Sequence, residues 1–169
     1  MENAMKRAKK IIYSANNLAL GVVMVMLMMM MFFTVGDVTG RYFGRPIQGT
    51  FEMTRYCLAV IVFLSLGYSQ INKVHIAIEI FYDRLPVILQ RIIDIFIYAT
   101  ATIMFALVFR NMLAYGGRLF VSKQFTTVLR VPVYPFVYAA AVGVLLFDLV
   151  LFTDFADAVH KLVKGGDEK

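Results

Sequence analysis

The ionisable residues that lie close to the ends of long apolar stretches are where this sequence could support chemistry. Arg91 and Asp94 open the third such stretch, and Asp148 lies about one turn before the end of the fourth. If these stretches are antiparallel neighbours, Arg91 and Asp148 can form an ion pair. Such a pair either locks two helices together or relays protons, and a relay needs further polar groups deeper in the membrane. The centres of the stretches are apolar, which favours the structural lock.

A second set of ionisable residues lies at the opposite ends of the same stretches: Arg41, Glu52, Arg55, Arg110 and Arg130. Thr50 is the expected N-cap of the second stretch, and Glu52 follows it by two residues. A carboxylate in a first helical turn complements the helix dipole, and we expect Glu52 to meet Arg41 or Arg110 as well. This pattern indicates a cap with a salt bridge rather than a substrate contact.

Residues for metal, haem or nucleotide chemistry are missing from the spans. His75 and His160 both fall outside them, and Cys57 is the one cysteine of the chain, so neither a membrane haem nor a disulfide nor a zinc site is expected. The first stretch holds six methionines, which we interpret as packing residues rather than as a path for a soft metal. The sequence therefore predicts no catalytic residue, no cofactor and no enzyme activity.

Composition places the chain in a bilayer. Of the 169 residues 60% are hydrophobic and 17% charged, against an apolar share of roughly 45–50% in soluble domains. A soluble protein of this size would expose large apolar patches and aggregate. The formal net charge of +6 is spread among the segments between apolar stretches, which fits basic flanks of membrane spans better than a nucleic-acid surface.

Four spans follow from the uncharged stretches, since about 20 apolar residues cross a membrane as a helix. We place them at about 18–36, 53–72, 92–112 and 132–152, within a single membrane domain covering residues 1–169. Pro132 and Pro135 are expected in the first turn of the fourth span. The residues after Thr153 are expected to form a short helix that frays at Gly165 and Gly166.

Orientation follows from the basic residues. Ten Lys and Arg residues fall on the side of the two termini and seven on the opposite side. Four of the ten directly precede the first span, and together with that long span they are typical of an uncleaved signal anchor. By the positive-inside rule both termini are expected in the cytoplasm.

The loop between the second and third spans has its own pattern. Apolar residues recur in it at helical spacing, and the charged residues fall elsewhere: Val74, Ala77, Ile78, Phe81 and Leu85 form the apolar set. We predict a short interfacial helix at about 73–86 that lies on the membrane surface. The predicted fold class is thus an all-α integral membrane protein, a bundle of four transmembrane helices with this interfacial helix between spans two and three.

Several loop and span motifs together resemble one known family. They are GRYFGRP at 40–46, Glu52 at the start of span two, FLSLG at 63–67, VHIAIE at 74–79, RLP at 84–86, and PVY at 132–134 preceded by Ser122 and Thr126. In this order around four spans they resemble the small membrane subunit of TRAP (tripartite ATP-independent periplasmic) transporters, the DctQ-type permease family. The Gln48-Gly49-Thr50-Phe51 segment departs from the family, which more often has an aromatic residue and a serine there.

The resemblance implies a role in sodium-driven uptake of an organic acid across the bacterial inner membrane. A periplasmic binding protein would deliver the substrate, and a large membrane subunit would hold the substrate and sodium sites. The small subunit would then be a non-catalytic scaffold, which fits the apolar centres of its spans. Small residues are expected to face the large subunit: Gly67, Ala99, Ala101, Ala139, Ala140 and Gly143.

Two sharper hypotheses concern the surface. Basic residues on the outer side, Arg41, Arg45, Arg118 and Lys123, are candidates for docking the binding protein, with ordinary lipid headgroup contact as the equal alternative. The 73–86 segment, with His75, is a candidate brace between spans two and three.

A small proton-coupled multidrug exporter that acts as a dimer is the main alternative function. Such exporters also have four spans, but they need a carboxylate embedded in the first span. The predicted first span has none, and Asp148 is the substitute that this sequence offers. An assembly or sensor protein of the inner membrane is a further alternative.

Overall fold

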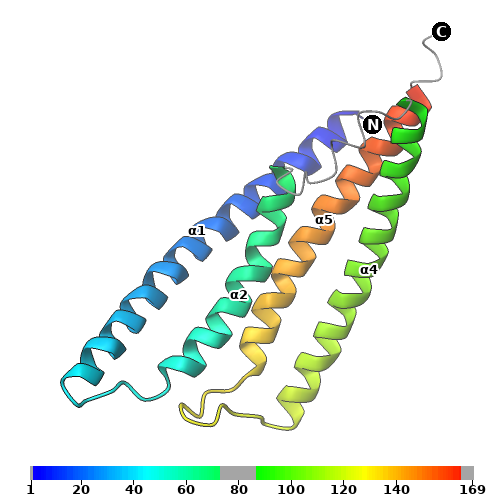
Figure 1. Ribbon diagram of the computed structural model, residues 1–169. Coiled ribbons are helices and arrows are strands. Elements are labelled where there is room, and N and C mark those ends of the chain that lie inside the picture. The colour runs from blue at the N-terminus through cyan, green and yellow to red at the C-terminus, as the bar shows by residue number, and fades with distance from the viewer. Residues whose placement is uncertain (1, 73–86, 165–169) are drawn as a thin grey trace.

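The computed structural model describes residues 2–72 and 87–164, and these residues form four long α-helices (Figure 1). They are α1 (Glu2–Tyr42), α2 (Thr50–Ile71), α4 (Val87–Val121) and α5 (Tyr134–Lys164). Each contains a stretch long and apolar enough to cross a membrane. Because lipid offers the backbone no hydrogen bonds, helices that satisfy their own N–H and C=O groups are the expected solution. The prediction of an all-α chain with four membrane-spanning helices is confirmed for the described residues, whereas the predicted interfacial helix at 73–86, with His75, lies outside them.

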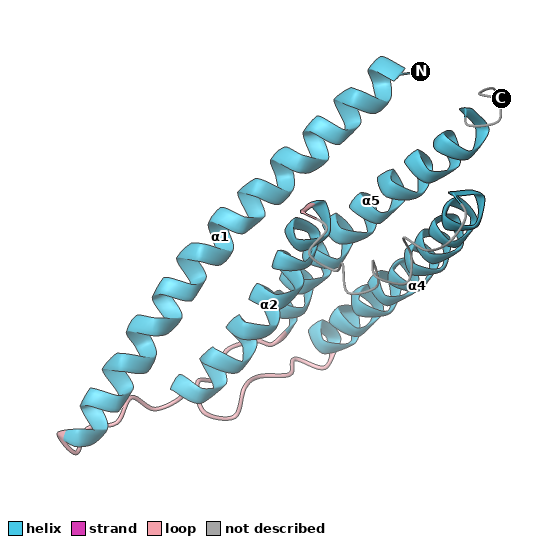
Figure 2. Cartoon of the chain, turned by 45° about the horizontal axis from the view of Figure 1, so that its top comes forward, coloured by secondary structure: helices cyan, strands magenta, loops and turns pink. Residues whose placement is uncertain are grey.

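The helices lie side by side in the order α1, α2, α5, α4 (Figures 1 and 2). Helix α5 packs extensively on both α2 and α4, α1 packs mainly on α2, and α1 touches α5 over a smaller area. The start of α1 and the end of α5 lie at one end of the row, called the terminal end below. Segments 43–49 and 122–133 connect the helices at the opposite end, called the loop end.

Helix α5 is the centre of the packing. In the most apolar 18 residues of α5, 44% are buried, whereas the corresponding stretch has 11% buried in α1 and none in α4. The buried apolar residues of α5 are Ala140, Ala141, Val144, Phe147, Val150 and Leu151, and a second cluster joins α1 to α2 through Ala19, Val23, Val60, Ile61 and Leu64. The outward faces of α1 and α4 are therefore apolar, and none of the other described residues covers them.

Two glycines allow close approach of the helices. A Cβ atom added to Gly143 of α5 would lie 2.5 Å from the carbonyl carbon of Phe63 in α2, so the two backbones touch there. At Gly67 of α2 an added Cβ would lie 2.0 Å from Oδ1 of Asn16, which is fully buried on α1. The expectation that Gly67, Ala140 and Gly143 face another protein is wrong, because all three are buried between helices of this chain.

Helix ends also differ from the sequence-based expectations. The N-cap of α2 is Gly49, in a left-handed conformation (φ 86°), and Thr50 is the first helical residue, whose hydroxyl donates to the Ile47 carbonyl (3.0 Å). Pro132 lies in the loop before α5, while Pro135 lies in its first turn. The residues after Thr153 are helical up to Lys164, as predicted, and they continue α5.

Candidate functional site at the loop end

Asp37 anchors the first loop to the end of α1. Its carboxylate is buried (5% exposed) and accepts a hydrogen bond from the backbone N–H of Ile47 (2.9 Å). Its other oxygen pairs with Arg41 one turn later, 2.9 Å from Nε and 2.8 Å from the terminal nitrogen. One oxygen of Asp37 therefore holds segment 43–49 against α1, and the other pairs with Arg41 within the last turn of α1.

Glu52 anchors the second loop to the start of α2. Its carboxylate accepts hydrogen bonds from the backbone N–H of Val128 (3.0 and 3.1 Å) and of Leu129 (3.2 Å). The side chain of Leu129 lies over Gly49, where an added Cβ would be 2.4 Å from its Cγ. The expected contact of Glu52 with Arg41 or Arg110 is wrong, because Arg41 pairs with Asp37 and the Glu52 oxygens face the loop backbone.

Segment 122–133 is a compact hairpin-like loop. Thr126 is buried, and it exchanges two hydrogen bonds with Val131: its N–H donates to the Val131 carbonyl (2.9 Å), and its hydroxyl oxygen accepts from the Val131 N–H (3.1 Å). Lys123 and Arg130 adopt left-handed conformations with φ of 47° and 50°, and both are exposed. The loop thus presents basic side chains outside the membrane-spanning part.

The loop end as a whole is strongly basic. Segments 37–55 and 110–130 hold seven Lys and Arg residues and two carboxylates, Asp37 and Glu52, which are both used internally. Arg45 is exposed, and Arg118 lies over the ring of Tyr115 with its guanidinium carbon 5.9 Å from the ring centroid. What this surface offers to a partner is positive charge.

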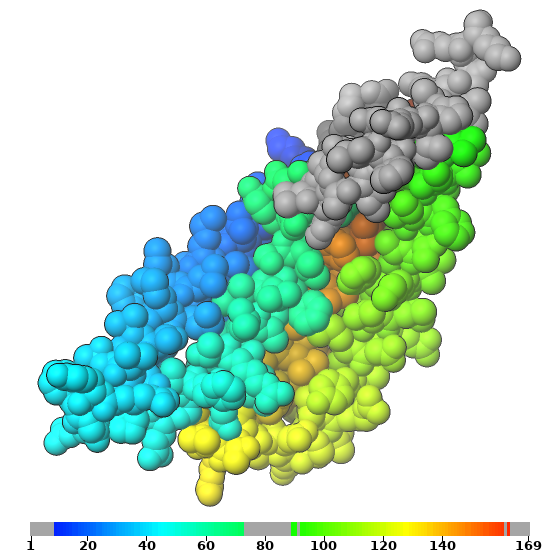
Figure 3. Space-filling view, viewed as in Figure 1, coloured from blue at the N-terminus to red at the C-terminus, as the bar shows by residue number. Residues whose placement is uncertain are grey.

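An open groove of about 800 Å³ begins at this end and lies between α2 and α4 over α5. Figure 3 shows α5, in gold and orange, recessed between the other two helices. The groove has basic, polar and apolar lining residues: Arg55, Tyr56, Ala59 and Phe63 on α2; Val108, Asn111, Met112, Tyr115 and Arg118 on α4; 124–127 in the loop; and Val133, Phe136, Val137 and Ala140 leading into α5. Its size is within the range of roughly 300–1,000 Å³ typical of ligand sites.

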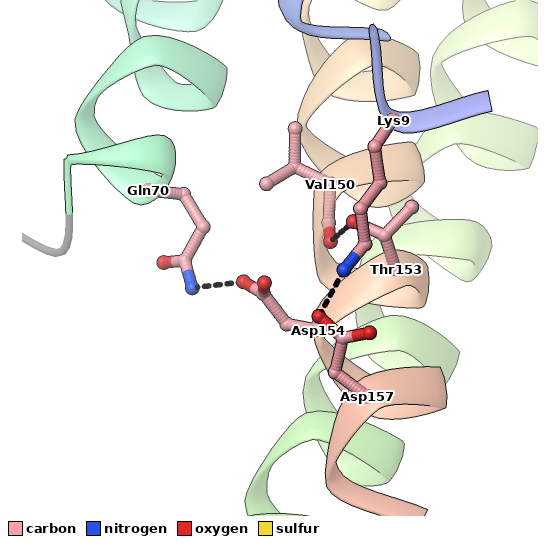
Figure 4. Close-up of polar contacts among 6 residues, drawn as sticks. All are labelled: Lys9, Gln70, Val150, Thr153, Asp154 and Asp157. Carbon is pink, nitrogen blue, oxygen red and sulfur yellow. Dashed lines mark hydrogen bonds and ion pairs between the residues drawn. The ribbon is translucent and has the colours of Figure 1, made fainter. Parts of the chain in front are cut away.

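The terminal end is held by a different set of polar contacts (Figure 4). Lys9 of α1 pairs with Asp157 of α5, and the amide of Gln70 in α2 donates to Asp154 of α5 (3.0 Å). Three helices are thereby joined at one level. These contacts fix the spacing of α1, α2 and α5 and bring no reactive group together.

The predicted pairing of Arg91 with Asp148 is wrong. The rings of Phe105 and Phe147 are 4.6 Å apart, which sets the register between α4 and α5. Arg91 lies fourteen residues before Phe105, so its backbone is about 21 Å along the helix from the level of Asp148. Asp148 is half-buried, and one of its oxygens has no hydrogen-bond partner among the described residues. Asp94 is half-buried one turn before Tyr98.

The methionines and Cys57 were considered as ligands of a soft metal ion, and the structure shows them packed closely together. Cys57 and four methionines of α1 and α2 line a pocket of only about 40 Å³, consistent with packing. Within residues 2–72 and 87–164, no three His, Cys, Asp or Glu side chains are grouped so that they could hold a metal ion.

Several residues that hold the helices together were not predicted from the sequence. Asp37 was treated as the end of a span, although its spacing of four from Arg41 was a visible signal for an ion pair on a helix. The burial of Asn16 against Gly67 was not predicted, because Asn16 lies in a stretch that was assigned from its lack of charged residues. The pairing of Lys9 with Asp157 joins residues 148 apart in sequence, and no local pattern indicates it.

Comparison with known proteins gives one match. The model of a family described as "Tripartite ATP-independent periplasmic transporters, DctQ component" matches residues 30–161, which include the C-terminal part of α1, all of α2 and α4, and most of α5. Searches of curated proteins and of solved structures each gave no significant match.

Proposed function

The chain belongs to the DctQ component family of tripartite ATP-independent periplasmic transporters, and we propose that it is the small, non-catalytic membrane subunit of such a transporter. In this proposal it pairs with a large membrane subunit that performs sodium-driven uptake of an organic acid, which a periplasmic binding protein delivers. The chain itself is a multi-pass membrane protein.

The family match over residues 30–161 is the observation that carries this proposal. The structure supports a scaffold role, since the carboxylates at the loop end and the polar groups at the terminal end are engaged in holding helices and loops together. The apolar outward faces of α1 and α4 offer surface for lipid and for a large subunit, where helices associate through shape and close packing.

The proposed location is the bacterial inner membrane with both termini in the cytoplasm. The excess of basic residues at the terminal end, led by those just before the first span, supports this orientation. The loop end would then face the periplasm, where a binding protein arrives.

The exporter alternative relies on Asp148, because Asp37, at the end of the first span, is engaged elsewhere. The Asp37 carboxylate is the one closest to the first span, and both of its oxygens are engaged by Arg41 and the Ile47 N–H. It is therefore committed to a structural contact rather than available for exchange of protons and cations.

Co-purification tests the proposal directly. The tagged chain is extracted gently from its native membrane, and its partners are identified by mass spectrometry. We expect one large, many-helix membrane protein in equal amount, and uptake of an organic acid by proteoliposomes only when both subunits and the binding protein are present. Recovery of the chain alone as a dimer would contradict the proposal and favour the exporter.

We further propose that exposed basic residues of the loop end dock the binding protein. Of the four residues predicted to dock it, Arg41 is partly neutralised by Asp37 and Arg118 lies over the Tyr115 ring, so the proposal keeps Arg45 and Lys123 and adds the exposed Arg130. Cationic groups at a rim act mainly on the association rate, and salt screens them. Reversal of these three charges to Glu is expected to slow association about tenfold or more at low salt. Lys10→Glu, an exposed change at the terminal end, is the control, and equal rates for both variants would exclude docking by charge.

A further inference from the structure

The groove between α2 and α4 combines a basic mouth with an apolar interior. Arg55 and Arg118 lie at its loop end, and no Asp or Glu is among its lining residues. Within the part of the chain that the structure describes, neither arginine forms an ion pair with a carboxylate. Two cations thus face the same space without a counter-charge from the described residues.

The polarity of the groove changes along the helix axes. On α2, Phe63 lies eight residues beyond Arg55, which corresponds to about 12 Å, and on α4 Val108 lies ten residues from Arg118, about 15 Å. Gln124 and Thr127 line the part near the mouth, whereas Phe63, Val108 and Ala140 line the deeper part, where Asn111, one turn from Val108, is a polar residue among the apolar ones. The apolar depth matches the hydrocarbon layer of one leaflet, which is half of about 30 Å.

This match in depth favours a lipid over a helix of another protein. A transmembrane helix needs contacts along about 30 Å, and the groove extends over only the loop-side half of the membrane. A lipid fits both features, because its phosphate lies at the headgroup level and its acyl chain extends to the midplane.

We propose that this groove binds an anionic glycerophospholipid of the loop-side leaflet. Its phosphodiester lies between Arg55 and Arg118, and one acyl chain lies along Phe63, Val108 and Ala140. Arginine forms charge-assisted hydrogen bonds with phosphate oxygens, and burial of each CH₂ group adds to the binding. The lipid fills the space between α2 and α4, which both pack on α5, and so holds them apart at a fixed distance.

Native mass spectrometry of the full chain, purified from membranes together with whatever subunit accompanies it, tests this proposal. The protein is titrated with phosphatidylglycerol and with phosphatidylcholine of the same acyl chains. The variants are Arg55→Gln combined with Arg118→Gln, which removes the charge, and Ala59→Phe, which fills the groove from an exposed position. Arg45→Gln removes an exposed positive charge outside the groove and is the matched control.

We expect tight binding of phosphatidylglycerol to the wild type and to the control, and weaker binding of phosphatidylcholine. The double arginine variant is expected to bind phosphatidylglycerol at least about tenfold more weakly, the effect of one lost charge-assisted hydrogen bond. Ala59→Phe is expected to weaken binding by a similar factor, about tenfold, because the ring takes the space of the acyl chain. Circular dichroism and melting curves establish that all variants are folded.

Three results would overturn the proposal. Unchanged phosphatidylglycerol binding in both groove variants would place the lipid elsewhere. Loss in the arginine variant alone, with competition by inorganic phosphate, would indicate a simple anion site without an acyl chain. Release of the large subunit by Ala59→Phe, with no lipid bound in the wild type, would assign the groove to a protein partner instead.

Discussion

Gly143→Ala is expected to separate α2 from α5. The added Cβ would lie 2.5 Å from the carbonyl carbon of Phe63, 2.6 Å from its oxygen and 2.7 Å from the nitrogen of Leu64. Because these are backbone atoms, no side-chain rotation relieves the clash, and the helices must move apart by up to about 1 Å. A gap of about 0.5–1 Å already forfeits roughly a quarter to a half of the dispersion attraction between facing atoms. We expect a loss of about 1–3 kcal/mol in the free energy of unfolding.

Unfolding of the purified chain by SDS in mixed micelles, followed by far-UV circular dichroism, measures this loss. Gly21→Ala and Gly117→Ala are matched controls, since an added Cβ at either site meets no atom within 4 Å. In a helix interior alanine is favoured over glycine by up to about 1 kcal/mol, so the controls are expected to be neutral or slightly stabilised. Gly143→Ala with the same stability as these controls would refute the close contact of α2 with α5.

Two further predictions concern other contacts. Gly67→Ala places a Cβ against the side chain of Asn16 rather than against backbone. In the same unfolding assay it is expected to lower the free energy of unfolding by about 1–3 kcal/mol alone, and by much less when it is combined with Asn16→Ala. Additive effects of the two substitutions would argue against this contact. Glu52→Ala removes the acceptor for the N–H groups of Val128 and Leu129. It is expected to speed amide hydrogen exchange in segment 122–133 and to leave exchange in segment 43–49 unchanged. Equal exchange in the wild type and the variant would show that Glu52 does not hold this loop.

The hydropathy pattern was sufficient to predict the number and type of the helices. A stretch of uncharged residues from 11 to 36 can only be stable in lipid as a helix, whatever it packs against. The predicted spans were nevertheless shorter than the helices, because hydropathy marks where the chain is in hydrocarbon and not where backbone hydrogen bonding ends. Helix α1 runs to Tyr42, past Asp37, and the ion pair of Asp37 with the exposed Arg41 stabilises its last turn.

The hydrogen-bond and ion-pair partners of the charged side chains depended on how the helices and loops lie against one another. Glu52 had basic residues as expected partners, yet it binds backbone N–H groups of a loop more than 70 residues away. Arg91 and Asp148 had suitable charges, yet the contact of Phe105 with Phe147 places them at different depths.

The sequence by itself determined that this chain is a four-span helical membrane protein of a recognisable family, because both conclusions depend on local composition and on motifs in order. Only the tertiary structure decided which faces meet: that Gly67 and Gly143 lie inside the row of helices, and that Arg55 and Arg118 share one groove. The physical reason is that lipid is as apolar as a protein core. A helix in a membrane is apolar all round, so its sequence does not distinguish the face that packs on another helix from the face that contacts lipid.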